Sequence, residues 1–203
     1  MSLSRIGDKY GTQKNTHKSF GQTILDIYEP YFEPLKNEKI NILEIGVLDG
    51  ASIRTWHHYF RLAKIFGIDL VLPQLELDRV RLFKADQGDI FDLADVRTAI
   101  GEKFDIIIDD GSHINDFTLF SFEFFWDSLK SGGYYIIEDT ICTYDKASHD
   151  WPGMHLNRKV ANFDNKREDV NEFIVEKLRQ MDFNKSEIFY MHFYRNLIIM
   201  KKA

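Results

Sequence analysis

The sequence has one cysteine, no long apolar run and no concentration of basic residues. Cys142 is the only cysteine among 203 residues, which excludes an internal disulfide and is typical of a reducing compartment. No apolar stretch approaches the ~20 residues that a helix needs to span a bilayer. The N-terminus also lacks the apolar run of a secretory signal. We therefore expect a cytoplasmic protein without membrane insertion.

The charge and size of the chain further limit the classes of protein to which it can belong. The net charge is −6, and Lys and Arg are scattered, so no basic surface is predicted for a nucleic acid. Apolar residues make up 44% of the chain and aromatic residues 14%, which is enough to build a core without a disulfide or a structural metal. We expect one domain that spans residues 1–203.

Short β-rich runs alternate with helical patterns, which is typical of βαβ units and a mostly parallel sheet. Five parallel strands are expected at 40–45, 64–69, 80–84, 104–109 and 134–137, the last after a turn at Gly132-Gly133. Two more, at 187–192 and 197–201, would form a C-terminal antiparallel hairpin. Helices are expected before the first strand, ending near Pro34, and at 51–60, 117–129 and 170–181. The pattern predicts an α/β Rossmann-like fold with a seven-stranded sheet, the plan of class I S-adenosylmethionine (SAM) methyltransferases.

The segment 42–52, ILEIGVLDGAS, carries the strongest signal for a ligand. Gly46 follows a buried strand, where the backbone must turn sharply and allow a ligand to approach. A nicotinamide-binding turn would need G-x-G-x-x-G, whereas here Gly46 and Gly50 are four residues apart. Glu44 precedes the turn on the same strand, and acids there suit a cationic sulfonium and an amino group better than a pyrophosphate.

Polar residues at the ends of the next two strands extend this signal. Asp69 ends the second strand, where an acid in doubly wound folds binds a ribose diol. Asp86 and Gln87 follow the third strand and are placed for an adenine amino group. Together with the glycine turn, these residues predict a SAM site.

Carboxylates also gather at the ends of strands four and five. Asp109 and Asp110 end the fourth strand, and Glu138 and Asp139 end the fifth. Because the carboxyl ends of parallel strands open on one edge, these acids would repel one another unless a cation intervenes. Oxygen ligands without thiolates favour Mg²⁺ or a similar ion. The alternative is that these acids only cap turns or pair with surface lysines.

An acidic cluster of this kind has a chemical use in methyl transfer to an alcohol. The hydroxyl must lose its proton as it attacks the sulfonium methyl, and a metal lowers the pKa of an oxygen that it binds. His113 lies three residues beyond Asp110, and histidine is the side chain that most often serves as a general base.

Seven motifs together resemble the metal-dependent sugar O-methyltransferases of macrolide biosynthesis. Relatives in that group include the mycinamicin and elloramycin enzymes and the so-called cephalosporin-hydroxylase proteins. The most specific motifs are GDKYGT (7–12) and DDGSH (109–113); the others are ILEIGVLDG (42–50), WHHYF (56–60), IFGID (65–69), ADQGD (85–89) and IIEDT (136–140). The resemblance covers about residues 6–145.

The resemblance implies roles for particular residues. It makes Asp110, Glu138 and Asp139 the Mg²⁺ ligands and His113 the general base. It also implies an N-terminal active-site segment (1–20) that folds over the cofactor, although without the resemblance these residues would be expected to fray. The implied SAM-site residues are Lys9, Tyr10, Thr12, Glu44, Gly46, Asp69, Asp86, Gln87 and Asp109.

The acceptor is the least determined part of the prediction. A polar, irregular stretch at 140–166 is expected to be a long substrate loop. The favoured acceptor is a hydroxyl of a sugar, either nucleotide-linked, on a surface polysaccharide or on a natural product, and a homo-oligomer is compatible with the sequence. A catechol-like acceptor is the first alternative, with Phe117, Phe120, Trp126 and Tyr144 lining an aromatic pocket.

Two further alternatives change the chemistry. In an Fe(II) oxygenase, Asp110, His113 and a second histidine such as His155 would form a facial triad. A catalytically silent SAM-binding subunit would keep the cofactor site and lose the reaction.

Overall fold

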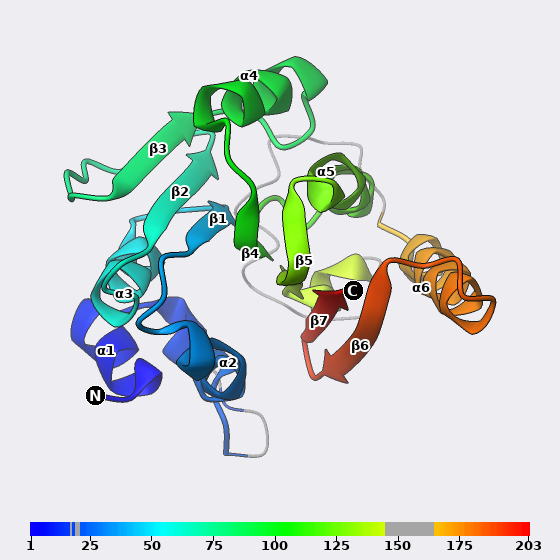
Figure 1. Cartoon of the computed structure of the whole chain (residues 1–203), viewed down its shortest axis with the longest axis horizontal. Coiled ribbons are helices and arrows are strands. Elements are labelled where there is room, and N and C mark those ends of the chain that lie inside the picture. The colour runs from blue at the N-terminus through cyan, green and yellow to red at the C-terminus, as the bar shows by residue number, and fades with distance from the viewer. Residues whose placement is uncertain (17, 19–20, 145–164) are drawn as a thin grey trace.

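The computed structural model describes residues 1–16, 18, 21–144 and 165–203. Its centre is a seven-stranded sheet in the order β3-β2-β1-β4-β5-β7-β6 (Figure 1). The strands β1 to β5 are parallel, and β7 is antiparallel to β5 and β6. The strands are β1 (Asn41–Ile45), β2 (Lys64–Asp69), β3 (Val80–Lys84), β4 (Phe104–Asp109), β5 (Leu129–Glu138), β6 (Ile188–Tyr194) and β7 (Leu197–Lys202). This arrangement confirms the predicted fold class and the C-terminal hairpin.

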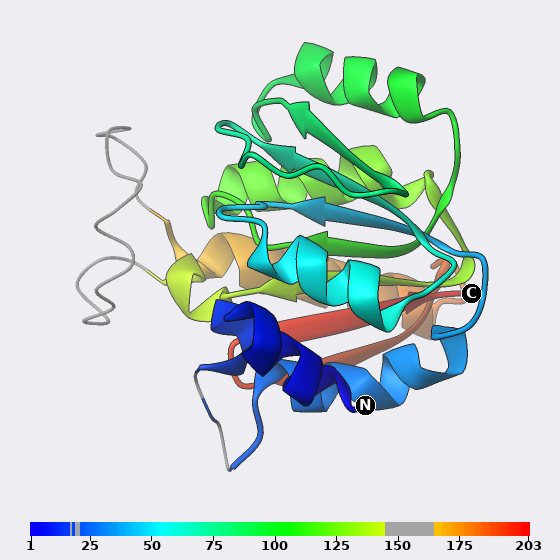
Figure 2. The same cartoon turned by 90° about the vertical axis from the view of Figure 1, so that its left-hand side faces the viewer.

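Helices cover both faces of the sheet (Figures 1 and 2). The first face carries α1 (Leu3–Tyr10), α2 (Ile24–Phe32) and α3 (Ala51–Tyr59), and the second carries α4 (Ile90–Ile100), α5 (Asn115–Trp126) and α6 (Arg167–Asp182). Short 3₁₀ turns lie at Gln13–Asn15, Glu33–Leu35 and Thr140–Thr143. Every residue of β1 is buried, because a central parallel strand has a helical layer on each side. No helix within the described ranges is both long enough and apolar enough to cross a bilayer.

Two helices differ from the expectation. Residues 3–10 form a regular helix instead of a frayed end: Ser2 caps its first turn, Gly11 ends it in the left-handed conformation, and Leu3 and Ile6 are buried. The helix α4 was not expected from the pattern. Its first two residues, Ile90 and Phe91, are apolar but exposed, which obscures the helical period.

The expected turn at Gly132-Gly133 is wrong. Both glycines lie inside β5, where the pairing with β4 shifts between Phe104 and Ile106. Gly132 has φ +77°, so the chain makes a bulge without leaving the sheet. Glycines in a strand produce the same sequence signal whether they form a bulge or a turn.

Candidate active site

A cavity of about 450 Å³ opens at the carboxyl ends of the parallel strands. Its walls come from the N-terminal segment, the loops after β1, β2, β3, β4 and β5, and the turn between β6 and β7. A cavity of this size and place, at the point where strand order reverses beside β1, is the usual ligand site of an open α/β sheet.

The loop between β1 and α3 forms one wall by backbone geometry. Gly46 has φ +88°, and a Cβ there would collide with the backbone carbonyl of Asp110. Asp69 at the end of β2 accepts hydrogen bonds from the backbone N–H groups of Val47 and Leu48, both at 2.8 Å. The structure therefore brings Gly46 and Asp69 together on the cavity wall, as expected.

Gln87 and Asp109 are hydrogen-bonded to each other, and only Gln87 lines the cavity. The Gln87 amide nitrogen lies 2.9 Å from both carboxylate oxygens of Asp109, and its carbonyl accepts the Ser112 N–H at 2.9 Å. Asp109 also accepts from Ser121 Oγ, and burial raises the pKa of Asp109 to about 6. Gln87 and Asp86 line the cavity, whereas the structure does not bring Asp109 to the cavity wall. Its buried bonds hold the end of β4 against α5.

Glu44 also lies behind the cavity wall. Its Oε2 accepts from Ser52 Oγ at 2.8 Å and from Trp56 Nε1 at 3.1 Å, both on α3. The side chain is fully buried and is not one of the lining residues. Glu44 therefore links β1 to α3. Because it does not line the cavity, it is not in position for the direct contact with a cofactor that the sequence predicted.

Of the three N-terminal residues predicted for the cofactor site, Thr12 lines the cavity, whereas Lys9 and Tyr10 do not. Tyr10 forms a hydrogen bond with His58 Nδ1 at 3.0 Å, and the Lys9 ammonium lies over the Tyr10 ring. Neither residue lines the cavity, because α1 turns them toward α3, whereas Thr12, Gln13 and Lys14 do line it.

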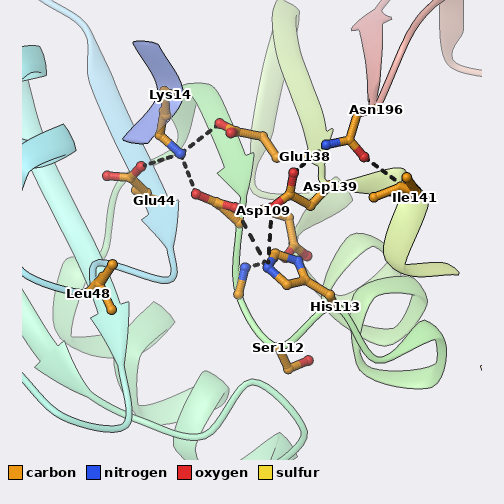
Figure 3. Close-up of polar contacts among 12 residues, drawn as sticks. Lys14, Glu44, Leu48, Asp109, Ser112, His113, Glu138, Asp139, Ile141 and Asn196 are labelled. Atoms are coloured by element: carbon orange, nitrogen blue, oxygen red, sulfur yellow. Dashed lines mark hydrogen bonds and ion pairs between the residues drawn. The ribbon is translucent and has the colours of Figure 1, made fainter. Parts of the chain in front are cut away.

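Lys14 stands among three carboxylates (Figure 3). Its Nζ lies 2.5 Å from Asp110 Oδ2, 2.8 Å from Glu138 Oε1 and 3.3 Å from Glu44 Oε1. Burial opposes the charge of Lys14, but the three carboxylates outweigh it and raise its pKa well above the ordinary value. The sequence analysis missed Lys14, because a single lysine in a polar segment carries no pattern.

Glu138 is held from two sides at the base of the cavity. Besides Lys14, it accepts a hydrogen bond from Tyr28 OH of α2 at 2.6 Å. Burial raises the pKa of Glu138 to about 8, although Lys14 works against that shift. The carboxylate expected as a metal ligand is thus partnered by protein groups on at least one of its oxygens.

Asp110, His113 and Asp139 form a more open group. His113 Nε2 lies 3.9 Å from Asp110 Oδ1 and 3.8 Å from Asp139 Oδ2. One ligand atom from each of the three lies within 4.8 Å of the others, a spacing that one metal ion could bridge. The two carboxylates fit Mg²⁺ or a similar hard divalent ion by donor chemistry, and the imidazole lies beside them. Three of the four residues predicted for the metal and the base therefore meet here, with Glu138 beside them.

Strained backbone marks the same place. His113 has φ +56°, Asp139 φ +50° and Asn196 φ +67°, a region that non-glycine residues seldom adopt. Asn196, in the turn between β6 and β7, donates to Asp139 Oδ1 at 2.5 Å and accepts the Ile141 N–H at 2.7 Å (Figure 3). The sequence analysis missed Asn196, and the available signal was its position in a tight hairpin turn, where Asn favours positive φ.

A second asparagine fixes the loop that carries His113. The Asn165 amide donates to the carbonyls of His113 and Cys142, both at 2.7 Å, and its oxygen accepts the Asn115 N–H at 3.0 Å. Tyr144 and Asn165 both line the cavity. The expected substrate loop 140–166 therefore meets the cavity at both ends, and its residues 145–164 lie outside the described residues.

The structure can be compared with the two alternatives of the sequence analysis, a catechol-like acceptor and an Fe(II) oxygenase. Phe117 and Tyr144 line the cavity, but Phe120 and Trp126 pack against the core beneath α4 and α5. The four-residue aromatic pocket expected for a catechol is therefore wrong. His155, the second histidine of the oxygenase alternative, lies outside the described residues.

No protein-family model matches the sequence, but individual relatives do. The chain is 28% identical to demethylmacrocin O-methyltransferase of Streptomyces fradiae over 87% of its own length and 47% of that enzyme. It is 33% identical to mycinamicin VI 2''-O-methyltransferase of Micromonospora griseorubida over 75% of its own length and 38% of that enzyme. The chain is a relative of the natural-product sugar O-methyltransferases. It spans less than half the length of these relatives.

Solved structures agree with this relationship. The MycE methyltransferase of the mycinamycin biosynthetic pathway, in complex with Mg and SAH, covers the whole chain at a TM-score of 0.80 and 25% identity, using 55% of its own length. A complex of the same enzyme with Mg, SAH and mycinamycin VI covers it at 0.79 and 26%. A caffeoyl-CoA O-methyltransferase-like protein from Staphylococcus aureus, at 0.61 and 16%, shares the fold alone.

Proposed function

We propose that this protein is a SAM-dependent O-methyltransferase that uses a divalent metal, and that its acceptor is a hydroxyl of a sugar or a sugar-containing molecule. The observation that carries the proposal is the open group of Asp110, His113 and Asp139 beside the glycine turn at Gly46. The two relatives named above are O-methyltransferases of demethylmacrocin and of mycinamicin VI, and the MycE complexes hold Mg and SAH.

On the donor side, the chain provides shape more than charge. The positive φ at Gly46 and Gly50 lets the β1 loop lie close to a bound nucleoside. Asp69 at the end of β2 would bind the ribose hydroxyls, and Asp86 in the loop after β3 would bind the adenine amino group. The apolar side chains of Leu48, Leu70 and Phe117 complete this end of the cavity.

On the acceptor side, Asp110 and Asp139 would hold the metal ion together with Glu138. A bound divalent ion supplies a Lewis acid that lowers the pKa of the acceptor hydroxyl. His113 would take the proton of that hydroxyl while the hydroxyl oxygen attacks the methyl carbon of SAM, whose carbon–sulfur bond breaks to release SAH. Its two carboxylate neighbours then stabilise the imidazolium.

Nucleotide-linked sugars are the finer proposal for the acceptor, in a cytoplasmic enzyme that forms homo-oligomers. The test is mass spectrometry of the purified protein incubated with SAM, Mg²⁺ and a panel of nucleotide sugars, glycosides and catechols. We expect one added methyl group on a sugar. Methylation of catechols alone would exclude the sugar acceptor, and no methylation of any compound in the panel would favour a silent SAM-binding protein.

Removal of the metal tests the mechanism separately. EDTA should abolish turnover and leave SAH binding intact, because Gly46 and Asp69 need no metal to keep their positions. Isothermal titration with SAH in EDTA and an activity assay in the same buffer measure both effects. Full activity in EDTA would remove the metal from the mechanism.

A further inference from the structure

Lys14 is the feature of the site that the proposed function does not use. Its side chain is 4% exposed, and it contacts three carboxylates, one in β1, one in β5 and one directly after β4. A buried ammonium without partners would be costly, so these ion pairs determine where the residue and its segment can lie. The 3₁₀ turn Gln13–Asn15 is thereby fixed to the sheet edge by one side chain.

The contacts of Asp110 divide between two neighbours. Lys14 binds its Oδ2, whereas its Oδ1 faces His113 Nε2 at 3.9 Å. A carboxylate held by one oxygen keeps the direction of the other, and such outer contacts orient metal ligands in proteins. The same ammonium holds Glu138 by Oε1, with Tyr28 on the same oxygen.

The charges of the site also favour a cation beside Lys14. Four carboxylates, those of Glu44, Asp110, Glu138 and Asp139, lie around this end of the cavity, and Lys14 contacts three of them. The acids outnumber the ammonium, and the oxygens of Asp110 and Asp139 that face His113 are not contacted by Lys14, so they remain as donors for a divalent cation. Lys14 and the cation can therefore act together, with the ammonium on the inner side and the ion on the side of His113.

We propose that Lys14 is a positioning residue, whose ammonium orients Asp110 and Glu138 so that a divalent cation binds between Asp110, Glu138 and Asp139 on the His113 side. This inference rests on the proposed function only in the identity of the metal ligands. Lys14 itself touches neither the cation nor the reacting atoms.

The test measures Mn²⁺ binding without any turnover. Free Mn²⁺ is counted by electron paramagnetic resonance during titration of the wild type, Lys14→Met and the control Lys39→Met, which removes an exposed lysine outside the site. We expect Lys14→Met to raise the Mn²⁺ dissociation constant about tenfold or more, and Lys39→Met to leave it unchanged. In EDTA, Lys14→Met should also melt about 10 °C lower than the wild type.

A second variant separates the charge from the space that the side chain fills. In Lys14→Ala, millimolar propylammonium should restore most of the Mn²⁺ affinity, whereas 1-propanol should not. The variant is purified in propylammonium, so that it is measured even if the fold depends on the charge. Equal rescue by the alcohol, or wild-type affinity in both variants, would overturn the positioning role and leave the proposed methyl transfer intact. A wild type that binds no Mn²⁺ would overturn both.

Discussion

The two ends of the cavity are built in different ways. At the donor end, the wall is mainly backbone: Gly46 and Gly50 turn the chain, and Asp69 is fixed by two N–H groups of the adjacent loop. At the acidic end, the wall is made of side chains from segments far apart in sequence, including Lys14, Glu138 and Asn196. A site built from backbone is set by a few local residues, whereas one built from side chains depends on each distant partner.

The largest effect on turnover is expected at the acidic end, from loss of the base. His113→Asn removes the imidazole but keeps a residue type that tolerates positive φ. We expect kcat to fall by roughly 10²–10⁴, with SAH affinity unchanged. Steady-state kinetics measure the loss, and His57→Asn, which changes a half-buried histidine that is paired with Asp78 outside the cavity, is the control. An unchanged kcat would remove His113 from the reaction.

The next largest effect is expected on SAH binding, from a substitution that disturbs the backbone at the donor end. In Gly46→Ala, the new Cβ meets the Asp110 carbonyl and φ stays near +88°, so the loop must move. The strain corresponds to about 1–3 kcal/mol, or roughly 10–100-fold in the SAH dissociation constant. Titration calorimetry measures it.

The matched control is Gly101→Ala at the end of α4. This glycine also has positive φ, +66°, but the nearest atom to its Cβ is 3.8 Å away and it does not line the cavity. The variant should lose a little stability and bind SAH normally. Equal loss of SAH affinity in both variants would contradict the close approach at Gly46.

A smaller effect is expected from the hairpin turn. Asn196→Gly keeps the positive φ and removes both hydrogen bonds that hold Asp139 and Ile141. We expect about tenfold weaker Mn²⁺ binding, measured by electron paramagnetic resonance. Asn184→Gly, at another positive φ after α6, is the control and should bind Mn²⁺ as the wild type does. The prediction fails if the two variants bind the ion equally well.

The smallest effect is expected at Cys142, in the 3₁₀ turn after Asp139. Burial, with help from the nearby carboxylates, raises the pKa of Cys142 to about 12, so the reactive thiolate is scarce between pH 7 and 9. Iodoacetamide should leave the native protein unlabelled and active, and label it only after unfolding, as read by intact-mass spectrometry. Rapid labelling of the native protein would show that this end of the cavity is open.

The contrast between the two ends also explains what the sequence could predict. Buried strands and the glycine turn are local patterns, so the sheet could be predicted from the sequence, and the structure brings Gly46 and Asp69 together on the cavity wall. The DDGSH and IIEDT motifs end adjacent strands, so their meeting followed from topology alone. Lys14 and Asn196 come from opposite ends of the sequence. Only the tertiary fold places them beside the same cluster, where Lys14 contacts Asp110 and Asn196 contacts Asp139. The sequence did not indicate that Asp109 lies behind the cavity wall, because a strand-end acid can face inward and its partner Ser121 lies on a later helix.

Tyr144 and Asn165 enclose a stretch of twenty residues between two fixed points on the cavity wall. Asn165 is anchored by three hydrogen bonds to parts of the site that are independent of that stretch. The entropy of closing a loop rises by only about 0.6 kcal/mol when its length doubles. Evolution could therefore exchange the stretch for one of another length or composition while the donor site and the base stay in place. A single scaffold would in this way supply many acceptor specificities.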